Sequence, residues 1–483
     1  MPILRDGVTA DSFYTPDIYI EEQVPDIPEQ PAGVSSKVMG IIGQFQKGSV
    51  NDVITVVGEK QFKEKMGAFL DNFPGSKAAF TAFKRGVQKL ILVNVRGAGA
   101  TQASLVLKDR ASTPVDTMKI SKKDHNAFGN ECTVEVANGT NAGSFKIILV
   151  APGLPTEVYD NNTTPQEAVD AINKLSKEFI AENLNSATAA PGNLPKIIAA
   201  TKLVGGSDGS APTATHYKGS TDSSTGKKTG LELMKTSIEV TDIVTDTYVS
   251  DVMNDALPTA AETMNWFTYL PMSKGTSVST AITTRSNYDT EFAHLSLGWA
   301  KSRDKGWWVP VAVYDCIAHV LNLVQDGTAG FTFADIDALD VELNAADYET
   351  LSAAQVVCMG QMLDAQRNLV YGLKSDYTLS KDPRYKQTFR RRITSLLETD
   401  LYILMTPYRS KHISKSMLDE AEIVTRKYFD DRIAGEMIQG YTIAFTPPEK
   451  VGNVDELIED LKVDLYNIAD KIRIRLLSAT NAL

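Results

Sequence analysis

A serine among small residues is the most obvious candidate for chemistry in this chain. Ser277 lies in Gly275-Thr276-Ser277-Val278, a setting that suits a nucleophilic hydroxyl. A serine nucleophile also needs a histidine base and a carboxylate that orients the histidine. Only His125 and His216 precede Ser277, and neither stands in a matching context. The sequence therefore disfavours a serine hydrolase.

No cofactor or metal motif stands out elsewhere. Gly226-Lys227-Lys228-Thr229 resembles the end of a phosphate-binding loop, but Thr221 replaces that loop's first glycine. No HExxH pattern occurs, and the histidines stand singly as His125, His216, His294, His319 and His412. The cysteines are too far apart for a metal or redox pair, which predicts buried reduced thiols at Cys132, Cys316 and Cys358. We therefore expect no enzyme activity, no cofactor and no metal site.

The bulk composition predicts a chain that folds. Of 483 residues 43% are hydrophobic and 23% charged, which suits about three domains plus extensions. The formal net charge of −11 disfavours binding to nucleic acid or to an anionic membrane. The most apolar stretch, Trp307 to Val324, contains Pro310 and Asp315, so we expect a buried strand and helix there. The first residues lack a secretory pattern, which predicts cytoplasmic synthesis and disfavours a secreted adhesin.

Alternating strand and helix patterns predict an α/β core. The expected elements are strands at 38–43, 89–95, 238–244 and 266–271, and helices at 60–69, 77–85 and near Ala260. Short alternating runs at about 105–150 predict an inserted, sandwich-like β domain, followed by a helix from Pro165 to about Glu182. The Gly-, Ser- and Thr-rich stretch 205–230 predicts a loop boundary.

The C-terminal part predicts two amphipathic helices and then strands. The apolar faces comprise Tyr385, Phe389, Ile393 and Leu396 in the first helix, and Met417, Ala421, Val424 and Tyr428 in the second. Ser416 is the expected N-cap of the second helix. Apolar and charged residues alternate in two stretches, Leu461 to Leu465 and Ile472 to Leu476. This is the period of a half-buried strand. Each strand would either be donated to another sheet or accept a further strand at its edge.

The N-terminal segment cannot bury itself. Residues 1–36 are rich in proline and in acidic residues, with Arg5 as the only basic one. Composition alone favours a disordered tail. The β-prone clusters around Tyr14 and Ile18 to Ile20 give the alternative, a strand that pairs with an open sheet edge elsewhere.

Several short stretches occur in an order that is typical of one family. They are Tyr14 to Glu22, Val38 to Gly43, Lys47 to Asn51, Glu59 to Gly67, Val93 to Arg96, Gly129-Asn130, Gly205 to Gly209, Arg390 to Leu397 and Ala434 to Tyr441. In this order they resemble the tail sheath proteins of contractile bacteriophages and related injection machines, over nearly the whole chain. Asp17 and Ser49 depart from the pattern, which has Gly and Pro there. Gly205-Gly206-Ser207-Asp208-Gly209 is the most specific match, although it also reads as a glycine turn with an aspartate cap.

The resemblance implies an α/β (α+β multidomain) fold with a subtilisin-like core that lacks protease activity. The implied segments are an N-terminal arm (1–36), the first part of the core (37–104), an inserted β-sandwich-like domain (105–204), a loop (205–230), the subtilisin-like α/β domain (231–375), a C-terminal α+β domain (376–460) and a C-terminal strand arm (461–483).

The resemblance also implies a structural role. Subunits would stack as hexameric rings around a tail tube, exchange terminal strands with neighbours, and contract to drive the tube through a cell envelope. Implied partners are further copies, the tube protein, and baseplate and terminator proteins, without nucleic acid or stable membrane insertion. The particle would be a virion assembled in the bacterial cytoplasm, a phage-derived bacteriocin or another injection device; the sequence leaves these three open.

The residues expected to act in assembly lie at the two ends and in one basic helix. The expected arm contacts are Tyr14, Ile18, Tyr19, Ile20, Leu461, Val463, Leu465, Ile472, Ile474 and Leu476. Arg390, Arg391 and Arg392 are expected to face the tube or a neighbouring subunit. A nucleic-acid patch is the less favoured interpretation of this basic stretch.

Overall fold

The computed structural model describes residues 3–4, 20–21, 38–364, 366–446 and 458–467. The chain forms two compact units, a larger one from Lys37–Arg392 and a smaller one from Met1–Ser36 together with Ile393–Leu483. Several sheets alternate with helices, so the expected mixed α/β architecture is confirmed. The division into seven segments stays a prediction. Among the described residues, no helix combines the length and the apolarity that a membrane crossing requires.

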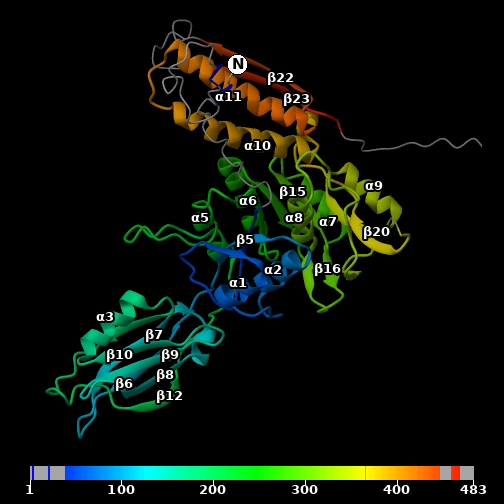
Figure 1. The fold of residues 1–483 in the computed structure, drawn as a ribbon. Helices are drawn as coiled ribbons and strands as arrows, with labels where there is room; N and C mark the ends of the chain where they lie inside the picture. Colours follow the sequence, from blue (N-terminus) through cyan, green and yellow to red (C-terminus); the bar gives the residue numbers. More distant parts are fainter. Residues whose placement is uncertain (1–2, 5–19, 22–37, 365, 447–457, 468–483) are drawn as a thin grey trace, which may run out of the picture. The chain divides into compact units, whose positions relative to one another are not determined.

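A nine-stranded sheet forms the core of the larger unit (Figure 1). Its strands are, in order, β18 (Thr332–Phe333), β21 (Leu369–Leu373), β20 (Val357–Leu363), β15 (Ala293–Leu297), β14 (Phe267–Pro271), β13 (Asp242–Thr245), β3 (Met39–Gly43), β5 (Lys89–Asn94) and β4 (Ile54–Val57). The strands from β20 to β5 run parallel, and antiparallel strands close both ends. Parallel pairing of β3 with β5, with helices between them in the chain, agrees with the predicted alternation of strands and helices.

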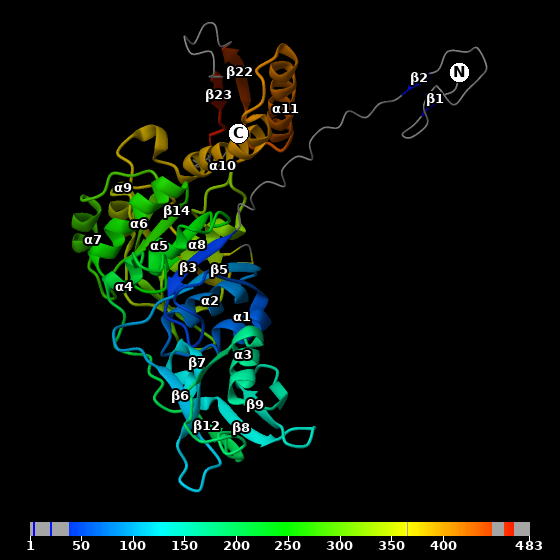
Figure 2. The same ribbon diagram turned by 90° about the vertical axis from the view of Figure 1, so that its left-hand side faces the viewer.

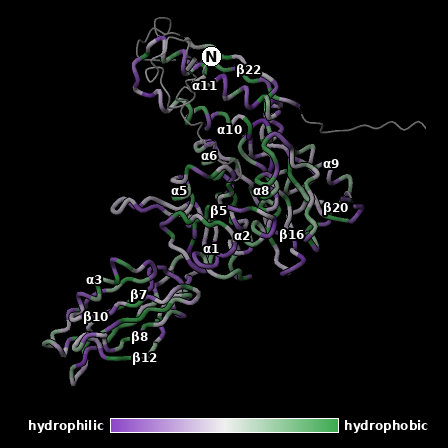
Figure 3. The backbone as a smooth tube through the Cα atoms, in the orientation of Figure 1, coloured by the Kyte–Doolittle hydropathy of each residue, from purple (hydrophilic) through white to green (hydrophobic). Residues whose placement is uncertain are grey.

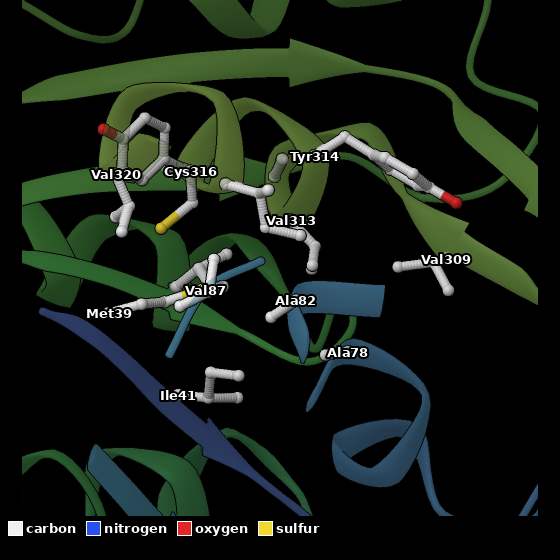
Figure 4. Close-up of a cluster of buried hydrophobic side chains, with 14 of the residues drawn as sticks. Met39, Ile41, Ala78, Ala82, Val87, Val309, Val313, Tyr314, Cys316 and Val320 are labelled. Atoms are coloured by element: carbon white, nitrogen blue, oxygen red, sulfur yellow. The ribbon is translucent and has the colours of Figure 1, made fainter. Parts of the chain in front are cut away.

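Helices cover both faces of this sheet, which explains why its central strands are apolar on both sides. On one face, Met39 and Ile41 pack with α2 (Pro74–Lys84) and with α8 (Val311–Leu321), as Figure 4 shows. Ile42 belongs to the cluster on the opposite face, with α6 (Asp251–Met264). The remaining helices of this unit are α1 (Gly58–Met66), α4 (Ala214–Lys218), α5 (Gly230–Met234), α7 (Val278–Arg285) and α9 (Ala345–Ala353).

A β-rich insertion leaves the core after β5 and returns before β13. It has a four-stranded antiparallel sheet, β10-β9-β8-β12, and a three-stranded antiparallel sheet, β11-β7-β6. The strands are β6 (Gln102–Lys108), β7 (Asp116–His125), β8 (Thr133–Asn138), β9 (Phe145–Val150), β10 (Glu157–Asn162), β11 (Phe179–Asn183) and β12 (Ile198–Lys202). Both sheets and α3 (Pro165–Leu175) share one hydrophobic cluster. Buried and less buried positions alternate along β8 and β9. Figure 3 shows hydrophobic and hydrophilic positions close together in this insertion.

Three smaller elements complete the larger unit. The strands β17 (Trp308–Pro310), β16 (Trp299–Ser302) and β19 (Ile336–Leu339) form a separate antiparallel sheet. The strand β17 leads directly into the buried α8, so the strand and helix predicted for Trp307 to Val324 are confirmed.

All three cysteines are buried and free, as predicted.

Several predicted element boundaries are wrong, such as the end of the helix predicted at 60–69, which lies at Met66, and three further cases have a visible cause or a clear offset. The helix from Pro165 ends at Leu175, because the Ser176 hydroxyl accepts the backbone N–H of Phe179 at 2.8 Å and turns the chain into β11. The strand predicted from Ile238 begins only at Asp242, since the side chain of Ile238 is 85% exposed. The helix predicted around Tyr385 begins at Thr388, after the short helix Pro383–Tyr385.

The described part of the smaller unit contains two α-helices, the short helix Thr406–Tyr408 and two strand pairs (Figure 2). Helix α10 (Thr388–Met405) begins in the larger unit and ends in the smaller one. It is followed by α11 (Lys415–Ala434) and by the antiparallel pair β22 (Gly440–Thr446) and β23 (Ile458–Asp464). Near the N-terminus, β1 (Ile3–Leu4) pairs in parallel with β2 (Ile20–Glu21).

Candidate assembly sites

The C-terminal hairpin holds three of the predicted arm residues. Leu461 and Val463 lie in β23, opposite Ile443 and Tyr441 of β22, and Leu465 follows the end of β23. Leu461 and Val463 are half-buried whereas Lys462 between them is exposed, so the predicted strand alternation is confirmed. The partner strand is this chain's own β22, so this segment is built into a hairpin of the subunit.

Helix α11 supports one face of the hairpin. The ring of Tyr441 lies 5.1 Å from that of Phe429, centroid to centroid, and the Tyr441 hydroxyl donates to Asp430 Oδ1 at 2.9 Å. Because strand side chains alternate, Val463, opposite Tyr441, lies on this same face. Among the described strands, β22 and β23 pair only with each other.

A carboxylate joins the two helices of the smaller unit. Asp400 Oδ2 of α10 accepts a hydrogen bond from the Tyr428 hydroxyl at 2.6 Å and one from Arg432 at 3.0 Å.

The predicted N-cap of α11 is wrong. Ser414 is the N-cap, and its hydroxyl accepts the backbone N–H of Met417 at 3.2 Å. The buried face of α11 is shifted slightly from the predicted one and comprises Met417, Ala421, Thr425, Tyr428 and Phe429.

Most of the other predicted arm contacts lie outside the described residues. Ile20 lies in β2 and pairs with Ile3. The residues outside are Tyr14, Ile18, Tyr19, Ile472, Ile474 and Leu476. Their role in assembly stays a prediction.

The basic stretch at the start of α10 is largely buried. Arg391 Nη1 pairs with Glu291 Oε1 at 2.9 Å. Arg392 Nη2 contacts both carboxylate oxygens of Asp242, at 3.1 and 2.9 Å. Burial acts to lower the pKa of Arg392, but the neighbouring Asp242 outweighs it and raises that pKa. Arg390 is half-buried and donates to the backbone oxygen of Arg384 at 3.4 Å, so it is the least buried member of the stretch.

A buried His–Asp network lies beside Arg392. His294 of β15 and His319 of α8 flank Asp315 of α8 and Asp376, and all four side chains are at most 5% exposed. His294 Nδ1 is 2.9 Å from Asp315 Oδ2, and His319 Nε2 is 3.1 Å from Asp376 Oδ1. Sequence analysis missed this cluster because the two histidines are far apart in the chain. The available signal was Asp315 and His319, which stand one helical turn apart.

The network shifts the proton equilibria of its members. Burial acts to lower the pKa of His319, but Asp376 and Asp315 raise it to about 9. Burial acts to raise the pKa of Asp376, yet His319 and His294 hold it well below its usual range. The two carboxylates are therefore charged in the folded chain, and they need cations beside them.

Ser277 has no catalytic partners among the described residues. It caps α7: its hydroxyl accepts the backbone N–H of Thr280 at 3.2 Å and lies 3.0 Å from the hydroxyl of Ser279. No histidine or carboxylate hydrogen-bonds to it in the described part of the chain. Its position is that of an ordinary helix cap.

Three of the sequence motifs meet where the insertion joins the core. Arg96 Nη1 donates to Asp208 Oδ1 at 2.9 Å, and the side chain of Asn130 exchanges two hydrogen bonds of 2.8 Å with the backbone of Gly206. A Cβ on Gly206 would lie 2.5 Å from the backbone oxygen of Asn126, which explains the glycine. Asp208 thus bonds across the junction instead of capping its own turn.

Comparison with family models and with curated protein sequences gives no match. Solved structures do match. The sheath tail protein of Listeria innocua has a TM-score of 0.66 at 12% identity, covering 89% of this chain and 92% of that one. The sheath tail protein of Desulfitobacterium hafniense has 0.57 at 12%, covering 93% and 100%. The contracted helical sheath of the anti-feeding prophage has 0.54 at 10%, covering 96% and 99%.

The chain has the sheath-protein fold. The resemblance drawn from the short motifs is therefore confirmed as a structural likeness over most of the chain. At identities of 9 to 12% the likeness to these structures concerns the fold. The sheath-protein fold includes both units, since the matches cover most of each.

Proposed function

We propose that the chain is a non-enzymatic structural subunit of a contractile sheath. The observation that carries this proposal is the match along almost the full length of the anti-feeding prophage sheath, a protein described in its contracted helical assembly. In the proposal, subunits stack as hexameric rings around a tail tube, between baseplate and terminator proteins, and contraction drives the tube through a cell envelope. A subtilisin-like core and the seven-segment division belong to the same proposal.

We further propose that terminal strands link the subunits. The outer edges of β22 and β23 are suited to accept a strand, since each presents backbone N–H and C=O groups to a newcomer. The arms proposed to fill them are the segment around Tyr14 to Ile20 and the strand Ile472 to Leu476 of neighbouring copies. Main-chain bonds of this kind survive when the bodies of subunits rotate past one another.

Deletion of either arm tests the linkage. We expect chains lacking residues 1–25, or lacking 472–476, to remain soluble and to stay monomeric by mass photometry. Ser277→Ala is the control, because a helix-cap hydroxyl contributes to stability and not to assembly. A deletion variant that still forms long ordered tubes would show that the deleted arm is not a linker.

Arg390 tests the proposed contact of the basic stretch with the tube or a neighbour. Reversal of Arg391 or Arg392 would break buried ion pairs, so only Arg390→Glu separates assembly from folding. We expect Arg390→Glu to lower the thermal midpoint less than reversal of Arg391 or Arg392 does, because Arg390 is less buried than these two, and to reduce tube recruitment or sheath assembly. If the Arg390→Glu variant recruits the tube and assembles like the wild type, Arg390 contacts neither the tube nor a neighbouring subunit.

The hydrolase alternative has a direct test as well. Substitution of Ser277 by Ala leaves the sheath proposal unaffected. A peptidase activity that the wild type shows and the Ser277→Ala variant lacks would support the hydrolase instead.

A further inference from the structure

Three side chains bring metal-binding atoms to one buried point of the larger unit. His294, His319 and Asp376 each offer one ligand atom, and these atoms lie within 4.8 Å of one another. Asp376 Oδ1 lies 3.1 Å from His319 Nε2 and 3.4 Å from His294 Nε2. Around a tetrahedral zinc ion with bonds of about 2.0–2.2 Å, neighbouring ligand atoms are about 3.3 Å apart. The two distances to Asp376 Oδ1 therefore fit a small divalent ion.

Hydrogen bonds on the far side of each ring fix the direction of the lone pairs. Nδ1 of His294 lies 2.9 Å from Asp315 Oδ2, and Nδ1 of His319 lies 3.0 Å from the backbone oxygen of Asp315. Both oxygens accept an N–H, so a neutral imidazole carries its lone pair on Nε2. Nε2 of His319 lies 3.1 Å from Asp376 Oδ1, and Nε2 of His294 faces the Thr388 hydroxyl at 2.5 Å. Metal-bound histidines are held in the same way by a carboxylate or carbonyl behind the ring.

The charges in the network favour the binding of a divalent cation. A bound ion displaces the proton of His319 and leaves both imidazoles neutral. Asp315 and Asp376 then contribute two negative charges, because Arg392 is engaged by Asp242. The second oxygen of Asp376 accepts the backbone N–H of Thr328 at 2.7 Å, which leaves Oδ1 for the ion. A divalent cation balances both carboxylates, whereas one proton balances only one of them. A net charge is costly in a site this deeply buried.

We propose that His294, His319 and Asp376 form a structural binding site for a divalent transition metal ion, with solvent in the fourth position. Imidazole and carboxylate together suit Zn²⁺. Asp315 is a positioning residue. The Thr388 hydroxyl, in the first turn of α10, lies 2.5 Å from His294 Nε2 and gives up this hydrogen bond when the ion binds. The ion joins β15, α8 and the segment between β21 and α10, and it enters while the chain folds, because all its protein ligands are buried.

The wild-type full chain provides the first test. We expect the purified protein to retain about one zinc ion per chain after gel filtration in a chelating buffer, as measured by mass spectrometry of the elements. We also expect protein refolded with Co²⁺ to show the visible absorption of a tetrahedral cobalt site. Wild-type protein without stoichiometric metal after refolding in Zn²⁺, and without the cobalt spectrum, would overturn the proposal and leave a protonated His319 as the holder of the network.

Substitutions of the proposed ligands test where the ion binds. Asp376→Asn and His319→Gln should abolish the cobalt spectrum, and Asp315→Asn should weaken metal affinity about 10- to 100-fold. His216→Gln is the matched control, since His216 bonds to Thr213 far from this cluster, and it should keep the metal. Retention of the spectrum in Asp376→Asn would place the ion elsewhere. The metal content and the cobalt spectrum do not depend on sheath assembly. Both measurements therefore test the metal site even if the chain proves not to be a sheath subunit.

Discussion

Arg392 and Asp242 show how charge is accommodated in the interior of the core. The two side chains are buried, and Asp242 Oδ1 also accepts a hydrogen bond from the Tyr269 hydroxyl at 2.6 Å. Arg392 donates in addition to the backbone oxygen of His319 at 3.1 Å. A buried ion pair of this kind is stable only with every partner in place. The triplet at Arg390 to Arg392 therefore acts mainly as an internal anchor of α10.

Removal of this anchor should be strongly destabilising. Arg392→Met leaves Asp242 charged and buried without its cation, so we expect a loss of about 3–5 kcal/mol in the free energy of unfolding of the larger unit. Urea titration followed by tryptophan fluorescence measures it. Lys108→Met, which removes an exposed pair with Asp116, is the control and should change stability by about 1 kcal/mol or less. Equal effects of the two substitutions would contradict the account.

Asp246 should make the stability of the larger unit depend on pH. Its carboxylate is buried and accepts from Gln44 N at 2.8 Å and from the Tyr217 hydroxyl at 2.7 Å, and burial raises its pKa to about 7. In the unfolded chain that pKa is about 3.9. Between these values the folded state keeps a proton that the unfolded state has lost. The stability that the protonated carboxyl contributes is thus complete below about pH 4 and is lost as the pH rises to about 7.

Comparison with Asp246→Asn isolates this effect. The difference in unfolding free energy, wild type minus variant, should fall by at most about 1.4 kcal/mol per pH unit from about pH 4 to 7 and be constant above. Urea titrations at a series of pH values measure it. A difference that is constant across the whole range would show that Asp246 is ionised in the folded chain throughout.

At the scale of elements, the hairpin explains the alternation of the C-terminal sequence. Leu461 and Val463 lie opposite Ile443 and Tyr441, and Tyr441 packs on Phe429 of α11. Lys462 and Asp464 fall on the other, exposed face. Apolar residues thus recur at every second position because a helix covers one side of the two-stranded sheet. A two-stranded sheet is marginal by itself, so both this helix and an added strand would stabilise it.

Leu461→Asp should loosen the hairpin from its helix. A charge on the face shared with Tyr441 loses apolar burial and adds desolvation, so we expect a loss of about 1–3 kcal/mol in local stability. Hydrogen exchange of β22, β23 and α11 measures it. Lys462→Asp, one residue further on the exposed face, is the matched control and should exchange like the wild type. Faster exchange in the control alone would reverse the assignment of the two faces.

Local patterns predicted the central strands of the core and seven of the described α-helices, and the failures have two physical causes. Met39 to Gly43 and Lys89 to Asn94 were recognisable as buried strands because helices cover both their faces. The helix from Pro165 was drawn too long because Phe179 also fits a helical period, whereas Ser176 ends the helix through its own hydrogen bonds. His294 and His319 meet only because parallel pairing and the crossover of α8 bring them together, which no local pattern records.

At the scale of the whole molecule, the ends of the chain carry the proposed function. The two units contain the buried clusters and account for folding. A subunit that passes strands to its neighbours head to tail builds an open helical array, because such contacts do not close on themselves. The account therefore predicts that assembly depends on protein concentration and on intact termini.

Electron microscopy of the purified full-length chain tests the central claim most directly. The account predicts hollow, striated sleeves in negative stain, with a six-fold pattern in end views. A chain that stays monomeric at every concentration with both termini intact, or that forms only small closed particles, would contradict the proposal that this is a sheath subunit.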